Sequence, residues 1–153
     1  MNKKNIEFRL LYRASKDGDN CSCFHSKCDK KYNVLFVIQT LKGLKFGGYS
    51  DLIWEGNDTP KEDNNLFVFS LDLLKKYNSL KGKKCMNPHK DRGPRIEPWI
   101  IWTPDQFFTK PGETCTKSQA LNYCEGFSTD YEINNGEMYF NINEFEAFQI
   151  IMT

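Results

Sequence analysis

A chain of 153 residues in which 21 basic residues nearly balance 20 acidic ones has a net charge of +1. This balance excludes a strong overall electrostatic attraction to nucleic acid or to an anionic membrane. Because a chain of this length buries roughly 70% of its unfolded surface, and 12 Phe, seven Tyr and three Trp supply apolar material, we expect one domain spanning residues 1–153.

The N-terminal sequence predicts the cellular compartment of the protein, and the compartment in turn predicts the state of the cysteines. Met1–Asn5 leads directly into a charged segment, without the apolar stretch of about 7–15 residues that a signal peptide requires. No stretch has the length and apolarity of a transmembrane helix. We therefore expect an intracellular, cytoplasmic protein whose six cysteines are free thiols, since disulfides rarely persist in a reducing compartment.

The N-terminal third predicts a strand, a helix and a hairpin. Phe8–Tyr12 is the first strand, and Asp19 or Asn20 then caps a short helix that ends near Asp29. Cys28 faces the core in this helix. These features predict a helix that rests on a sheet.

The next stretch predicts the hairpin around which the fold is organised. Val34–Ile38 is an unbroken apolar run, which is typical of a strand covered on both faces. Lys42-Gly43 allows the chain to turn back into Leu44–Phe46. Gly47-Gly48 within this pattern predicts a bulge, a bend or a close backbone approach.

The middle of the chain contains an acidic loop, a strand and a basic segment that Gly and Pro residues interrupt. Residues 55–65 form an acidic loop, and Leu66–Leu71 is the next strand. Leu71 to Tyr77 permits either a helical turn or a strand end. Lys81–Arg95 is strongly basic and is interrupted by Gly and Pro, so we expect a basic, irregular surface there.

The C-terminal third predicts further strands. Ile96–Trp102 is predicted as a strand with apolar residues on both faces. Residues 103–124 are predicted to be mostly loop. Phe127–Ile133 and Glu137–Ile151 are predicted as closing strands around the turn Asn134-Asn135-Gly136. The number of strands, the early helix and the spacing of turns favour a mainly β fold with short helices, in which two antiparallel sheets pack as a sandwich.

The hairpin also carries a family resemblance. Phe46-Gly47-Gly48-Tyr49-Ser50, followed by Trp54, resembles the signature of TLDc domains, the module of the oxidation-resistance family. Four other segments are similar to family motifs and follow in family order: 10–18, 24–29, 66–71, and 140–150 with Glu144 and Glu146. The resemblance covers about residues 8–151. The chain departs from it at Ile96–Trp99, where the family usually has glycines.

The resemblance implies a two-sheet antiparallel β-sandwich of the TLDc type that acts as a non-enzymatic protein-interaction module. It implies association with the peripheral sector of the vacuolar proton-pumping ATPase (V-ATPase), regulation of that pump, and a contribution to resistance against oxidative stress. A position at the cytosolic face of acidic organelles would follow. The contact surface and the oligomeric state stay open.

A cluster of possible metal ligands occurs in the predicted helix. Cys21, Cys23, His25 and Cys28 offer the thiolates and imidazole that structural zinc prefers. At about 100° per residue, however, Cys23 points away from the other three. We therefore expect no metal and no cofactor.

An enzyme is the alternative. Cys21 with His25, four residues apart, would form a redox or nucleophilic pair, and Glu144 with Glu146 a hydrolytic acid/base pair. Strict alternation with Phe140, Ile142, Phe148 and Ile150 turns both glutamates toward the core, where an unpaired carboxylate is costly. A bulge near Glu144-Phe145, or an ion pair with Arg9 or Arg13, would remove that cost. We expect one of these structural roles.

The basic segment supplies the predicted docking residues. Lys83, Lys84, Arg92 and Arg95 are expected to steer an acidic protein partner. Trp99 and Trp102 nearby have the side chains that stack on bases, so nucleic-acid binding is the competing interpretation. Because such runs are usually solvated loops, we expect a protein partner and no nucleic acid.

Overall fold

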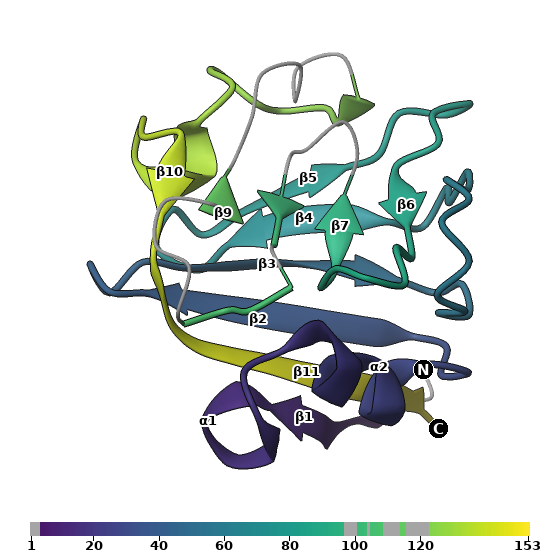
Figure 1. The fold of residues 1–153 in the computed structure, drawn as a ribbon. Helices are drawn as coiled ribbons and strands as arrows, with labels where there is room; N and C mark the ends of the chain where they lie inside the picture. Colours follow the sequence, from purple (N-terminus) through teal and green to yellow (C-terminus); the bar gives the residue numbers. More distant parts are fainter. Residues whose placement is uncertain (1–3, 97–100, 104, 109–113, 116–122) are drawn as a thin grey trace.

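The computed structural model describes residues 4–96, 101–103, 105–108, 114–115 and 123–153. Two antiparallel sheets and two short helices make up the fold (Figure 1). This arrangement confirms the predicted mainly β fold with short helices and is consistent with the predicted sandwich.

The large sheet has the strand order β1-β11-β2-β3-β4-β5. Its strands are β1 (Ile6–Arg13), β2 (Val34–Thr40), β3 (Lys45–Ser50), β4 (Phe67–Ser70), β5 (Lys75–Asn78) and β11 (Ile142–Met152). The second sheet has the order β10-β9-β8-β7-β6. Its strands are β6 (Met86–Asn87), β7 (Arg95–Ile96), β8 (Ile101–Trp102), β9 (Thr114–Cys115) and β10 (Tyr139–Phe140).

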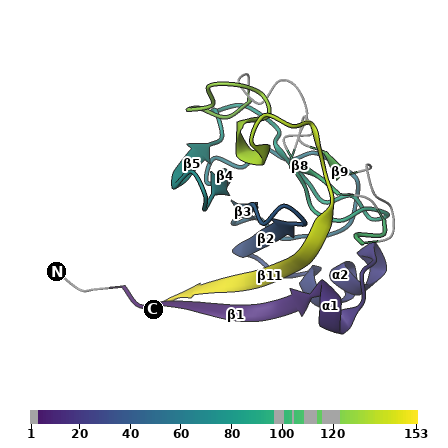
Figure 2. The same cartoon turned by 90° about the vertical axis from the view of Figure 1, so that its left-hand side faces the viewer.

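The helices lie on the same side of the large sheet as the second sheet (Figure 2). They are α1 (Ala14–Asp17) and α2 (Cys21–Cys28), and a 3-10 helix covers Glu132–Asn134. Within the described residues, no second layer covers the opposite face of the large sheet. The core therefore lies between the large sheet and the layer formed by the helices and the second sheet.

The predicted hairpin is β2–β3. Gly43 adopts a φ of 86°, and the amide of Thr40 donates to the carbonyl of Leu44 at 2.9 Å. Burial alternates along β2: Val34, Phe36 and Ile38 are buried, whereas the residues between them are only partly covered. The expectation of a strand covered on both faces is therefore wrong, because only the core face has a layer packed against it.

The glycine pair in β3 produces a close backbone approach and no bulge. Gly47 and Gly48 pair in regular register with β2 and β4. A Cβ on Gly47 would lie 1.9 Å from the carbonyl oxygen of Phe36, and one on Gly48 would lie 2.3 Å from Cδ1 of Ile96. Neither glycine has a positive φ.

The C-terminal strand β11 lies between β1 and β2, so the end of the chain completes the large sheet. A register shift between Ile142 and Glu144 changes which residues of the strand face the core. Phe145 and Ala147 are thereby fully buried. Four aromatic rings surround Phe145 at centroid distances of 4.9–6.0 Å, those of Tyr12, Phe24, Phe36 and Phe107.

Two predicted strands differ from the structure, and one predicted turn agrees with it. Ile96 and Ile101 pair across the antiparallel strands β7 and β8, so 96–102 is not one strand. Phe127–Ile133 is not a strand but leads through turns into the 3-10 helix. The turn after that helix is confirmed, since Asn135 and Gly136 have φ values of 54° and 84°.

Candidate functional site

Helix α2 begins where the sequence predicts. The Asn20 side chain accepts a hydrogen bond from the amide of Cys23 at 3.0 Å, which satisfies a free donor of the first turn. Phe24 and Cys28 are completely buried. Because Phe24 also packs against the ring of Trp54 at 5.8 Å, the helix is fixed to the segment that follows the hairpin.

His25 links α2 to the basic segment. Its Nδ1 lies 2.7 Å from Oδ1 of Asp29, and its Nε2 lies 2.9 Å and 2.8 Å from the carbonyl oxygens of His89 and Arg92. The side chain is only 10% exposed. The imidazole thus serves as a clamp between the helix and residues 89–92, and both of its nitrogens are engaged.

The thiols of Cys21 and Cys28 in α2 lack the features of an activated nucleophile. Burial, with a smaller contribution from Asp105, raises the pKa of Cys21. Burial also raises the pKa of Cys28. A reactive cysteine needs the opposite shift and a free base beside it, and His25 already contacts Asp29 and two carbonyls. The geometry gives no support to a Cys21–His25 pair or to a zinc site on this helix.

Glu144 and Glu146 do not both face the core, because a bulge interrupts strict alternation next to the position where the sequence analysis considered one. The bulge at Ile142–Glu144 places Phe145 inward instead. Glu144 accepts hydrogen bonds from the amides of Ser15 at 3.1 Å and Phe145 at 3.0 Å.

The second glutamate has a charged partner. Oε1 of Glu146 lies 2.5 Å from Nε of Arg13. The other arginine considered, Arg9, pairs with Glu7 at 3.6 Å. The two glutamates thus hold β11 to β1 and α1, which is the structural role expected for them.

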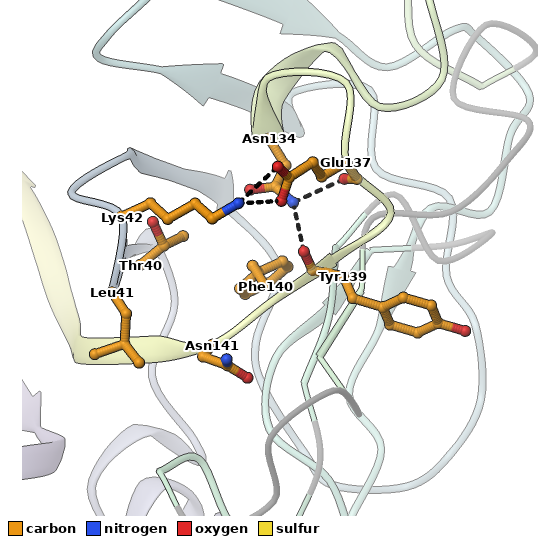
Figure 3. A pocket seen from close by; sticks show the side chains of 8 residues that line it. All are labelled: Thr40, Leu41, Lys42, Asn134, Glu137, Tyr139, Phe140 and Asn141. Atoms are coloured by element: carbon orange, nitrogen blue, oxygen red, sulfur yellow. Dashed lines mark hydrogen bonds and ion pairs between the residues drawn. The ribbon is translucent and has the colours of Figure 1, made fainter.

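A pocket of about 290 Å³ lies beside the β2–β3 turn (Figure 3). Lys42 donates to both carboxylate oxygens of Glu137 at 2.6 and 2.7 Å, and the Asn134 amide donates to the carbonyls of Glu137 and Tyr139. These groups fasten the turn to the segment before β10. The sequence does not reveal the pocket, because Lys42 and Glu137 are 95 residues apart and share no motif.

The basic segment is more ordered than predicted. Cys85 to Pro88 are buried, and the segment contains β6 and β7, so it is not an irregular surface loop. Lys84 is exposed, whereas Lys83 lies over the ring of Tyr123 at 4.9 Å. Arg92 pairs with Asp105 at 3.7 Å.

Arg95 is the fourth predicted docking residue, and Trp99 and Trp102 follow it in the sequence. Arg95 is partly buried within β7. The four predicted docking residues therefore lie on one segment. Of these four, Arg95 belongs to a strand and Arg92 forms an ion pair, whereas Lys83 and Lys84 do neither. Trp102 belongs to β8, and Trp99 lies outside the described residues.

One other cluster has the residue types of a metal site. Among the described residues, ligand atoms of Asp58, His89 and Asp91 lie within 4.8 Å of one another. Both aspartates are exposed. Oδ1 of Asp58 also accepts a hydrogen bond from the amide of Lys90 at 2.7 Å, so this carboxylate already ties the acidic loop to the basic segment.

Comparison with known families shows to which family the chain belongs. The model of the TLDc domain matches residues 1–96. The chain belongs to the TLDc domain family. The TLDc match contains the signature Phe46 to Tyr49 and Trp54, and ends before Glu144 and Glu146. Among curated proteins, no relative matches.

Phe46 and Trp54 of the TLDc signature lie in the core, whereas Tyr49 is only partly buried. Phe46 is buried and meets the ring of Phe140 edge-on at 5.0 Å, and Trp54 is buried against Phe24. Tyr49 stacks on Phe67 at 5.0 Å and donates to Asn33. Within the described residues, no helix is long and apolar enough to cross a membrane.

Proposed function

We propose that this chain is a non-enzymatic TLDc interaction module that binds the peripheral sector of the V-ATPase and regulates its assembly or activity. The observation that carries the proposal is the TLDc match over residues 1–96. Through the pump, the protein would contribute to resistance against oxidative stress.

The chemistry of the candidate catalytic groups also supports a binding role. Burial raises the pKa of Cys21 and Cys28, and Glu146 is in an ion pair. Catalysis by these groups would require a lowered thiol pKa or a free carboxylate. A structural scaffold that presents a docking surface requires neither.

The docking surface in this proposal is the basic segment with Lys83, Lys84, Arg92 and Arg95. Lys84 is exposed, and the other three lie at intermediate exposure on the same segment. A local concentration of positive charge speeds encounter with an acidic partner, and salt weakens the effect. The clamp by His25 holds the backbone of this segment in place.

The test measures association with the isolated peripheral sector of the pump. The double substitution Lys83→Glu and Lys84→Glu should slow association by about tenfold at low salt and leave the melting temperature within a few degrees. Arg92 and Arg95 are spared because one is ion-paired and the other lies in β7.

A matched control carries the same change of charge elsewhere. Lys16→Glu with Lys31→Glu alters two exposed lysines near the helices and should leave the on-rate unchanged. Equal on-rates for the wild type and the Lys83/Lys84 variant would remove this segment from the interface. No association of the wild type with the peripheral sector would overturn the choice of partner.

A further inference from the structure

Strand β1 forms an open edge of the large sheet. It pairs on one side with β11 and is the last strand in the sheet order (Figure 2). Ile6, Phe8 and Leu10 are 58%, 60% and 40% exposed, and the two residues between them are exposed as well. A long apolar edge strand is unusual, because its free backbone groups recruit another strand.

The opposite edge of the same sheet is protected. Strand β5 is four residues long and begins with Lys75-Lys76, and its end is covered by residues 123–125. The amide of Glu125 donates to the carbonyl of Asn78, and the amide of Leu80 donates to the carbonyl of Tyr123. Short length, charge and a covering segment are the usual means of blocking an edge. Strand β1 is eight residues long, and among the described residues no segment covers Ile6–Leu10. Its two charged residues, Glu7 and Arg9, have opposite signs, so they do not repel a second copy of the strand.

The hydrogen bonds show which backbone groups of β1 are free to pair. The amides of Asn5 and Thr153 each donate to the other residue's carbonyl, at 2.8 and 3.0 Å. In an antiparallel ladder such pairs alternate, so the odd-numbered residues of this stretch direct their backbone groups toward β11. The backbone groups of Ile6, Phe8 and Leu10 therefore point to the open edge.

The sequence of this stretch is complementary to itself. When two copies of Ile6–Leu10 run antiparallel and are centred on Phe8, Ile6 lies opposite Leu10 of the second copy. Glu7 lies opposite Arg9, and Phe8 lies opposite Phe8. Both charged side chains are more than half exposed, and the 3.6 Å ion pair that they make with each other within one copy would be exchanged for pairs across the two strands. Opposite charges and apolar pairs across strands are stabilising.

Neighbouring registers lack this complementarity. A shift centred on Glu7 places the two Glu7 side chains opposite each other, and one centred on Arg9 does the same for the two arginines, which is destabilising. Each shift also shortens the overlap. On the far side, the bulge between Leu10 and Tyr12 ends the regular edge. The open segment is thus centred on Phe8.

We propose that two copies of the chain associate through β1, with a two-fold axis at Phe8 that joins their large sheets into one continuous sheet. About six backbone hydrogen bonds would form, two for each of the three facing pairs. The axis keeps equivalent faces together, so Phe8, which packs on Phe148 at 6.4 Å, would meet its counterpart on the same face. This surface lies apart from the basic segment and is independent of the pump proposal.

The experiment uses charge reversal on the full chain, with mass measured by sedimentation equilibrium over a range of concentrations. The wild type should rise from 17.9 kDa toward about twice that mass. Glu7→Arg alone and Arg9→Glu alone should each raise the Kd of the dimer by about tenfold or more. The combined swap, Glu7→Arg with Arg9→Glu, should restore association.

Mixing gives the decisive result. In an equimolar mixture of the Glu7→Arg and Arg9→Glu chains, every cross-strand charge pair is again of opposite sign. The mixture should therefore form dimers at a concentration at which each variant alone is mostly monomeric. Phe8→Lys should abolish association, whereas Leu74→Lys, at a turn residue that is also highly exposed, should not. Circular dichroism and melting temperature check that each variant is folded.

Two results would overturn the proposal. A wild type that stays monomeric up to about 1 mM would exclude a dimer of useful affinity. A dimer whose Kd is the same in the wild type and in both single charge variants would place the interface elsewhere on the molecule.

Discussion

At the scale of single residues, the two adjacent glycines of β3 are required for different reasons. Gly47 faces the backbone of β2, where a Cβ would lie 1.9 Å from the carbonyl oxygen of Phe36. Gly48 faces the core, where the nearest atom is the terminal methyl carbon of Ile96 at 2.3 Å. A backbone oxygen held in a ladder cannot withdraw, whereas the end of an isoleucine side chain can rotate.

We therefore expect Gly47→Ala to destabilise the protein by about 3 kcal/mol and Gly48→Ala by about 1 kcal/mol. Chemical denaturation of the two variants measures the difference, and each serves as the control for the other because they share a strand and a register. A larger loss for Gly48→Ala would show that the second sheet packs more rigidly than the β2 backbone.

At the scale of elements, the His25 side chain joins α2 to the basic segment. His25 contacts the carbonyls of His89 and Arg92 from a helix whose other face packs Phe24 and Cys28 into the core. The segment between β6 and β7 therefore depends on a residue more than sixty positions away. Its sequence, with Pro88, Gly93 and Pro94, has little regular structure of its own to hold it.

Removing the clamp should loosen this segment. His25→Ala is expected to lower the free energy of unfolding by about 2 kcal/mol and to speed amide exchange in residues 89–96. Ser26→Ala is the matched control, because Ser26 is exposed on the same helix and should leave exchange there unchanged. Unchanged exchange in the His25 variant would mean that other contacts hold the segment.

At the scale of the whole molecule, the sheet is completed by the end of the chain. The TLDc match covers residues 1–96, yet β11 at 142–152 lies between β1 and β2 and contributes Phe145 to the centre of the core. Without β11, β1 would have no partner strand and the core would lose its central ring. One domain over residues 1–153 stays a prediction, which a fragment of the chain can test.

A fragment of residues 1–96 is accordingly expected to show no cooperative thermal transition, while the full chain unfolds in one step. Co-expression of residues 97–153 should restore the transition, because the missing strand is then supplied in trans. A sharp transition in the fragment alone would show that residues 1–96 fold as a unit of their own.

Local chemistry determined much of this protein from the sequence alone. Four local features depend on neighbouring residues and were predicted: a cap at Asp19 or Asn20, the helix after it, the turn at Gly43 and the turn at Asn134-Asn135-Gly136. The structure places the cap at Asn20. The family signature around Phe46 was predicted as well, because its residues are contiguous. The structural role of Glu146 was expected, with Arg13 as one of two possible partners.

Only the tertiary structure decided which surfaces are covered and which distant residues meet. The bulge at Ile142–Glu144 reversed the parity of β11, since burying Phe145 among four aromatic rings outweighs regular alternation. The pairing of β7 with β8 turned one predicted strand into two. The His25 clamp and the open edge of β1 were likewise invisible, because burial and strand neighbours depend on contacts between residues far apart in the chain.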